Sequence, residues 1–257
     1  MNLFDISGRV ALVTGGSKGL GRMIAETLVQ HGVRVYVTAR HADVCQKTAE
    51  ELSEFGECIA IPNDISTLDG VRELADTIKA RETKLDILIN NAGTGWHAPF
   101  DEFPEKGWDK TFNVNIKAPF FLTQQLAPLL RKAGSAEQPS KVINIASIDG
   151  LYVPPDAAYP YPASKAGLLH LTRKLAADLV KDHIHVNAIT PGAYPSDMNL
   201  AAKEDSEDLK RFIPAQRIGT AEDIGGTVVY MCSRAGDYLV GVNLTSDGGV
   251  VYARGYA

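Results

Sequence analysis

The sequence of 257 residues contains only three cysteines, Cys45, Cys58 and Cys232, and they lie far apart. No pair has the C-x-x-C spacing of a metal or redox motif, and three scattered thiols do not form a disulfide framework. This pattern favours reduced thiols, so we expect a cytoplasmic protein.

Long hydrophobic runs are absent as well. A membrane-spanning helix needs about 18 or more consecutive apolar residues, and no segment approaches that length. The N-terminal MNLFDISGRV lacks the positively charged stretch and apolar core of a secretory signal. The sequence therefore predicts neither a membrane partner nor a leader.

Positive charge is scarce, since 26 lysines and arginines stand against 31 acidic residues and give a net charge of −5. Proteins that bind nucleic acid present a basic patch to the phosphates, and no basic cluster is present here. His183 and His185 are two apart in an expected strand, but no third ligand accompanies them. We therefore predict neither nucleic-acid binding nor a metal site.

The chain does contain apolar strands that alternate with amphipathic helices about seven times, a pattern typical of an α/β fold. No internal repeat or proline- and serine-rich linker divides it. We predict one Rossmann-type, doubly wound parallel sheet of about seven strands with helices on both faces. A single dinucleotide-binding and catalytic domain should cover residues 1–257, with a polar flap at about 193–216.

A glycine-rich turn, GGSKGLG, lies between an apolar strand at 9–14 and an amphipathic helix at 23–32. Gly15 would permit a tight turn, Gly19 a close approach of the backbone to a pyrophosphate, and Gly21 close packing of helix and strand. The helix N-terminus would then face the anion. This context favours nucleotide binding over a simple turn.

The next strand, 33–40, ends in Ala39-Arg40, where proteins that bind NAD usually carry an acidic residue for the ribose hydroxyl. Arg40, helped by Lys18, suits a 2′-phosphate, because a guanidinium binds phosphate oxygens in a bidentate manner. The alternative is that both are solvated surface cations. We predict NADP(H) as the cofactor.

Polar residues and glycines follow the other expected strands too. Asp64 comes after a strand at 58–62 and is equally compatible with an adenine contact, an Asx turn or a helix N-cap. Asn91 and Gly93 follow the strand that begins at Leu85, and Pro191 follows the strand at 183–189. Because right-handed crossovers bring all these strand ends to one edge, they should form one ligand site.

Segment 144–165 carries the groups best suited to proton transfer. Tyr161 and Lys165 are spaced i and i+4, which places them on one face of a helix. A lysine ammonium beside a phenol should lower the phenol's pKa from about 10 and make it a general acid or base. Tyr159 is the rival, but only Tyr161 lies one turn before Lys165.

Prolines complicate this assignment, because Pro160 and Pro162 flank the tyrosine at the start of a helix expected over 163–181. Pro162 is tolerated only if that helix begins near Tyr159. Asn115 lies inside another expected helix, 107–133, where asparagine is a poor helix former. It is either a satisfied core amide or a residue that holds water near the site.

With these residues assembled, the whole chain resembles a short-chain dehydrogenase/reductase. The shared motifs are T-G-x-x-x-G-x-G at 14–21, N-N-A-G at 90–93, a serine at 147, Y-x-x-x-K at 161–165, P-G at 191–192 and D-G-G at 247–249. Within the family, the chain is similar to the rhamnolipid-type 3-oxoacyl reductases, which share its one-residue-longer separation of serine and tyrosine.

The resemblance implies that Tyr161 exchanges a proton with the substrate oxygen, Ser147 hydrogen-bonds that oxygen and Lys165 binds the nicotinamide ribose. Asn115 would hold a relay water. Besides the glycines, Lys18 and Arg40, the implied cofactor contacts are Ser17, Leu20, Asp64, Ile65, Asn91, Ala92, Gly93, Tyr161, Pro191, Gly192, Tyr194 and Ser196. A homotetramer or homodimer built on helices 107–133 and 163–181 is also implied.

For the substrate, a small carbonyl compound or alcohol, we favour a 3-oxoacyl thioester. Hydrophobic secondary alcohols, steroids and aromatic ketones are the alternative, and a non-catalytic NADPH sensor or scaffold is a third hypothesis. The expected pocket is apolar and aromatic, without a cation that would clamp an anion. Its residues are Gly95, Trp96, His97, Ser147, Leu151, Tyr152, Val153 and Tyr194.

Overall fold

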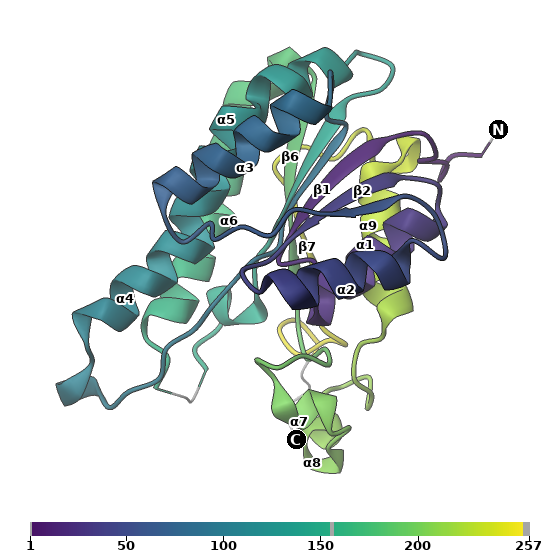
Figure 1. Cartoon of the computed structure of the whole chain (residues 1–257). Helices are drawn as coiled ribbons and strands as arrows, with labels where there is room; N and C mark the ends of the chain where they lie inside the picture. Colours follow the sequence, from purple (N-terminus) through teal and green to yellow (C-terminus); the bar gives the residue numbers. More distant parts are fainter. Residues whose placement is uncertain (1, 155–156, 254–257) are drawn as a thin grey trace.

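A sheet of seven parallel strands forms the centre of the computed structural model, which describes residues 2–154 and 157–253 (Figure 1). The strand order is β3-β2-β1-β4-β5-β6-β7. The strands are β1 Val10–Thr14, β2 Arg34–Thr38, β3 Cys58–Ala60, β4 Ile87–Asn90, β5 Ser140–Ile145, β6 Ile184–Pro191 and β7 Asn243–Ser246. The predicted doubly wound parallel sheet is confirmed.

Helices cover both faces of this sheet (Figure 1). One layer consists of α1 Gly19–Gln30, α2 Ala42–Leu52 and α9 Ala221–Cys232, and the other of α3 Leu68–Arg81, α5 Ala118–Ala133 and α6 Pro160–Leu179. Neighbouring side chains of β1 point to opposite faces, so Val13 packs with the α1 and α9 layer and Leu12 with the α3 and α5 layer. Strands buried on both faces explain why the sequence shows continuous apolar runs.

The helix expected over 107–133 is three segments, so that prediction is wrong in detail. Helix α4, Glu105–Phe112, leads into a π-helical turn, Asn113–Lys117, before α5 begins. Pro119 lies in the first turn of α5 and has no N–H to continue the ladder of hydrogen bonds from the preceding turn. The π turn that results carries Asn115.

The glycine-rich turn between β1 and α1 is shorter than the sequence indicated. Helix α1 begins at Gly19, whereas a start at residue 23 was expected. A Cβ on Gly21 would lie 2.1 Å from the Gly15 carbonyl oxygen and 2.4 Å from the Asn91 Nδ2. Only glycine therefore fits there, and the turn, β1 and the end of β4 form one packed unit. The helix N-terminus consequently opens at the carboxyl edge of the sheet.

Two short helices, α7 Leu200–Lys203 and α8 Glu207–Phe212, extend beyond the carboxyl ends of the strands (Figure 1). They lie within the segment 193–216, which we call the flap. His183 precedes β6 in a left-handed conformation and is exposed, so the prediction that it lies in the same strand as His185 is wrong. Among the described residues no three His, Cys, Asp or Glu side chains are grouped to hold a metal. None of the described helices is long and apolar enough to cross a membrane.

Candidate active site

Helix α6 begins at Pro160, which settles the question raised by the two prolines. Pro160 and Pro162 both lie in the first turn, where the missing N–H groups would have no helical partner in any case. Tyr161 is therefore helical and one turn before Lys165. The Lys165 Nζ lies 5.6 Å from the centre of the Tyr161 ring.

Lys165 is almost completely buried, with 3% of its surface exposed. Its Nζ donates a 2.8 Å hydrogen bond to the carbonyl of Ile145, the last residue of β5. Burial lowers the pKa of Lys165 to about 8, and the nearby charge of Asp149 acts in the opposite direction. The ammonium form therefore still predominates at pH 7, held between a strand end and the phenol.

Tyr159, the rival tyrosine, belongs to an aromatic cluster. Its ring packs edge-on against Phe100 and Phe103, with ring centres 5.7 and 5.6 Å away. Tyr161 faces the loop after β4 instead, since a Cβ on Gly95 would lie 3.7 Å from its ring. This geometry favours Tyr161 as the proton-transfer group.

Ser147 follows β5 and caps a 3-10 turn, Ile148–Gly150, by accepting a 3.2 Å hydrogen bond from the Asp149 backbone N–H. The turn packs directly on α6, because a Cβ on Gly150 would lie 2.8 Å from the backbone carbon of Lys165. This contact fixes Ser147 relative to the start of α6. Only 8% of the serine is exposed.

Asn115 is fully buried and braces the site. Its Oδ1 accepts a 2.9 Å hydrogen bond from the Thr94 N–H, and its Nδ2 donates to the Thr94 carbonyl at 2.9 Å and to the Ser164 Oγ at 3.0 Å. The asparagine is thus a satisfied core amide, the first of its two interpretations, and it lies in the π turn. Its role in holding a relay water stays a prediction.

Thr94 and Ser164 were not identified from the sequence. Each is adjacent to a recognised motif, Thr94 to the N-N-A-G motif and Ser164 to Lys165, but their link through Asn115 joins residues 21 and 49 positions apart. Gly93 lies within this arrangement, because a Cβ there would be 3.5 Å from the Lys165 Nζ and 3.6 Å from the Asn115 Oδ1. Gly93 itself is exposed, so the lysine and the amide border a solvent-accessible position.

Asn91 connects the ends of β1 and β4. Its Nδ2 donates to the carbonyls of Thr14 and Gly15 at 2.9 and 3.2 Å, while the Thr14 hydroxyl accepts hydrogen bonds from the N–H groups of Asn91 and Ala92, both at 3.0 Å. The glycine-rich turn and the N-N-A-G motif consequently form one surface, as their positions at strand ends predicted.

The two cations expected near a 2′-phosphate differ in their surroundings. Arg40 is exposed, and no ion pair joins it to any residue in the part of the chain that the structure describes. The Lys18 Nζ instead lies 2.7 Å from the Asp197 Oδ2 in the flap. Arg40 is thus available to a ligand, whereas Lys18 already has an anionic partner.

Asp64 forms the Asx turn that was one of its three interpretations, because its Oδ1 accepts a 3.0 Å hydrogen bond from the Ser66 N–H. The N-cap of α3 is Thr67, whose Oγ1 accepts from Gly70. Asp64 remains exposed, while Ile65 is buried. The proposed adenine contact therefore rests on the position of this turn at the sheet edge.

The expected pocket residues are dispersed. Gly95 lies beside Tyr161, and Trp96 packs on Gly107 of α4 with the Lys110 Nζ 5.6 Å from its ring. Leu151 packs on the core between β5, β6 and α6, and Tyr152 on the cluster below the flap. His97 is exposed, and Val153 projects into solvent with 90% of its surface exposed.

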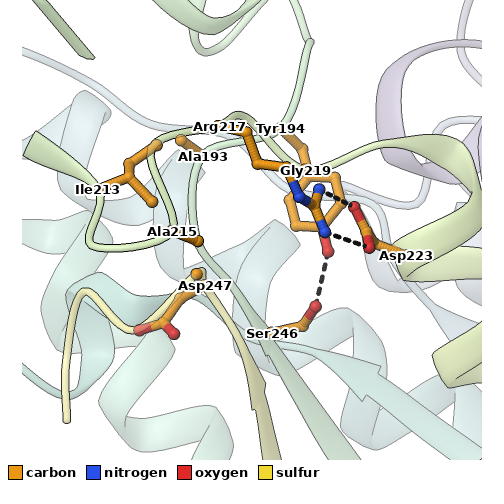
Figure 2. A pocket seen from close by; sticks show the side chains of 10 residues that line it. Ala193, Tyr194, Ile213, Ala215, Arg217, Gly219, Asp223, Ser246 and Asp247 are labelled. Atoms are coloured by element: carbon orange, nitrogen blue, oxygen red, sulfur yellow. Dashed lines mark hydrogen bonds and ion pairs between the residues drawn. The ribbon is translucent and has the colours of Figure 1, made fainter. Parts of the chain in front are cut away.

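Tyr194 is only 3% exposed, and its hydroxyl lies 2.6 Å from the Ser246 Oγ. It lines a small cavity of about 60 Å³ at the base of the flap (Figure 2). The Arg217 guanidinium makes a bidentate pair with the Asp223 carboxylate there, at 2.6 and 2.9 Å. These contacts fix the base of the flap to β7 and α9, so the tyrosine acts as an anchor.

Known proteins share both the sequence and this architecture. A family model described as "Enoyl-(Acyl carrier protein) reductase" matches residues 15–251. The "Rhamnolipids biosynthesis 3-oxoacyl-(acyl-carrier-protein) reductase" of Pseudomonas aeruginosa is 44% identical, over 96% of this chain and 97% of the relative. The "2-dehydro-3-deoxy-D-gluconate 5-dehydrogenase" of Dickeya dadantii is 36% identical, over 97% of this chain and 98% of the relative.

Solved structures give the same result. The "Pseudomonas aeruginosa RhlG/NADP active-site complex" superimposes with a TM-score of 0.93 and 43% identity, over 97% of this chain and 99% of that one. The likeness spans the glycine-rich turn, the strand edge and the helix that carries Tyr161 and Lys165. The chain belongs to the short-chain dehydrogenase/reductase family.

Proposed function

We propose that the protein is an NADP(H)-dependent oxidoreductase that interconverts a ketone and a secondary alcohol. The observation that carries the proposal is the buried ammonium of Lys165, one helical turn from Tyr161 and beside the exposed Gly93. A non-catalytic sensor would have no need of an ammonium buried against a phenol, because that burial is energetically costly.

The strand edge fits a dinucleotide. Gly15 has a positive φ of 64° and leaves room for the backbone of Ala92, 3.0 Å from where its Cβ would be. The N-terminus of α1 opens at this surface and favours an anion, and Arg40 is available for a 2′-phosphate. The relative RhlG was solved with NADP, which supports the same cofactor here.

In the proposed mechanism the nicotinamide, when bound, supplies or accepts the hydride. The substrate oxygen lies between the hydroxyls of Ser147 and Tyr161. Ser147 orients this oxygen by a hydrogen bond, and Tyr161 gives its phenolic proton to the oxygen in reduction and takes it back in oxidation. The Lys165 ammonium stabilises the phenolate that results, because the lysine is almost completely buried and water screens its charge little.

For the substrate we infer a 3-oxoacyl thioester. None of the expected pocket residues is a lysine or arginine, which argues against a sugar acid, whose carboxylate would need a cation. The exposed aromatic cluster of Phe100 and Tyr159 suits an acyl chain beside Tyr161. The Pseudomonas aeruginosa relative is named as a 3-oxoacyl reductase, which supports the same substrate class.

The proposal also includes the oligomeric state of the protein and its cellular compartment. Residues 1–257 would form one catalytic domain with a flap at 193–216, in a cytoplasmic homotetramer or homodimer. The three cysteines are buried free thiols, which suits a reducing compartment. Trp108 is 43% exposed on α4 and stacks on Phe112, with ring centres 5.1 Å apart, so an apolar surface lies along the segment expected to pair.

We expect Tyr161→Phe to lower the turnover of an acetoacetyl thioester with NADPH by about 10²-fold or more, because the phenolic proton is lost. NADPH affinity should change little. Tyr159→Phe is the matched control and should keep most activity. The decrease in NADPH absorbance measures the turnover of both variants. Substantial turnover by Tyr161→Phe would contradict the assignment. Activity on steroids or simple ketones alone would favour the alternative substrates.

We expect Lys165→Met to be inactive yet more stable at pH 7 by about 1–2 kcal/mol, because it removes the cost of burying an ammonium. The pKa of Lys165 is about 8 in the folded protein and about 10.4 in an unfolded chain, so the unfolded state binds more protons between these values. The stability of the wild type should therefore rise with pH in that window. The difference in stability between Lys165→Met and the wild type should become smaller.

Thermal unfolding at pH 7 and at pH 9.5 measures this effect. Lys165→Arg keeps the charge and is the control, which should gain no stability. A Lys165→Met variant that is less stable than the wild type at pH 7 would show that the buried ammonium carries no such cost.

The proposed assembly is tested by sedimentation equilibrium of the purified protein. We expect a dimer or tetramer, and Trp108→Glu should shift it toward the monomer by placing a charge on the exposed apolar surface of α4. A wild-type monomer at micromolar concentration would contradict the proposal.

A further inference from the structure

The flap passes directly over the glycine-rich turn. A Cβ on Gly19 would lie 3.1 Å from the Ser196 Cβ and 4.0 Å from the Pro195 carbonyl oxygen. Gly19 is the first residue of α1, so the flap backbone lies at the helix N-terminus where an anion would bind. A change at this contact therefore affects the flap and the cofactor surface together.

Two ion pairs of one carboxylate reinforce the contact between the flap and the glycine-rich turn. The two carboxylate oxygens of Asp197 each pair with a different lysine, Lys18 of the glycine-rich turn and Lys203 of α7, both at 2.7 Å. These bonds lower the pKa of Asp197 to about 2, so the carboxylate is charged at every physiological pH. Lys18 and Asp197 are 65% and 48% exposed, so water screens the pair and a ligand has access to it.

Lys18 is also next to the place expected for the 2′-phosphate. Thr14 and Thr38 are partners in the β1–β2 register, so the glycine-rich turn and Arg40 leave neighbouring strands at the same edge. The Gly16 N–H donates a 3.2 Å hydrogen bond to the Thr38 carbonyl, which holds the two segments together. Of the two cations at this edge, Arg40 forms an ion pair with no described residue. Lys18 is paired with Asp197 of the flap.

We propose that Asp197 is a cofactor-specificity residue, which holds Lys18 in the free protein and competes with the 2′-phosphate of NADP(H) for it. The inference rests on the proposed NADP(H)-linked function and adds a determinant outside the strand-end motifs. NAD(H) has no 2′-phosphate, so it leaves the pair of Lys18 and Asp197 intact. Asp197 consequently weakens NADP(H) binding and not NAD(H) binding.

The rest of the flap is anchored independently of this pair. The Gly219 N–H donates a 3.0 Å hydrogen bond to the Ala193 carbonyl and joins the two ends of the flap. Arg217 and Asp223 hold its base, as Figure 2 shows. Loss of Asp197 should therefore release Lys18 without disturbing the fold.

We expect Asp197→Asn to bind NADP⁺ about threefold to fivefold more tightly than the wild type, at the upper end of the contribution of one exposed ion pair. NAD⁺ affinity should change by less than about 1.5-fold, and the gain for NADP⁺ should shrink at high salt. Isothermal titration with both dinucleotides at low ionic strength measures these affinities. Asp208→Asn is the matched control, because Asp208 is an exposed flap carboxylate paired with Arg211 of its own helix.

A double-mutant cycle with Lys18→Met tests the route of the effect. In the Lys18→Met background, Asp197→Asn should give no gain, because the competition acts through Lys18. An equal gain for both dinucleotides, a gain that persists without Lys18, or unchanged NADP⁺ affinity in Asp197→Asn would overturn the inference alone. A wild-type protein that binds no NADP⁺ would overturn the proposed cofactor and this inference together.

Discussion

The ammonium of Lys165 lies in the interior, where its Nζ donates to the carbonyl at the end of β5 and lies 5.6 Å from the centre of the Tyr161 ring. Burial of a cation is costly, and here the hydrogen bond to Ile145 and the charge of Asp149 offset part of that cost. Much of the surrounding structure serves to keep the lysine in this position. The turn after β5 packs on it, and the exposed Gly93 lies beside its Nζ.

Asn115 is the second constraint, because it joins three separate parts of the chain. The π turn, the loop after β4 and the N-terminal part of α6 meet at its amide. Both polar atoms of that amide are hydrogen-bonded, so the three segments are fixed relative to one another. A site that transfers a proton needs such rigidity, since small displacements reduce the rate strongly.

The sheet and its functional edge could be predicted from the sequence, because buried parallel strands give continuous apolar runs and because glycines and polar residues follow them. Tyr161 and Lys165 could be paired because a helix makes i and i+4 neighbours. The position of Tyr159 could not be predicted, since it depends on Phe100 and Phe103 in a distant loop. The π turn was missed because Pro119, four residues after Asn115, is equally compatible with a simple kink.

Long-range polar contacts were the least predictable features. Lys18 was expected to bind a phosphate, but in the structure it pairs with Asp197. This partner is 179 residues away, and nothing local in the sequence links the two. Tyr194 was expected at the nicotinamide and substrate, whereas its hydroxyl bonds to Ser246, 52 residues away, and the ring is buried. Such pairs depend on how the flap folds back, which residue spacing does not encode.

The central claim is that the space bordered by Gly93, Tyr161 and Lys165 receives the nicotinamide end of NADP(H). A crystal structure of the protein with NADP⁺ tests it most directly. The account predicts the nicotinamide ribose in hydrogen-bond contact with Lys165 and the 2′-phosphate at Arg40. A dinucleotide bound with its nicotinamide away from Lys165, or with its 2′-phosphate away from Arg40, would contradict the account.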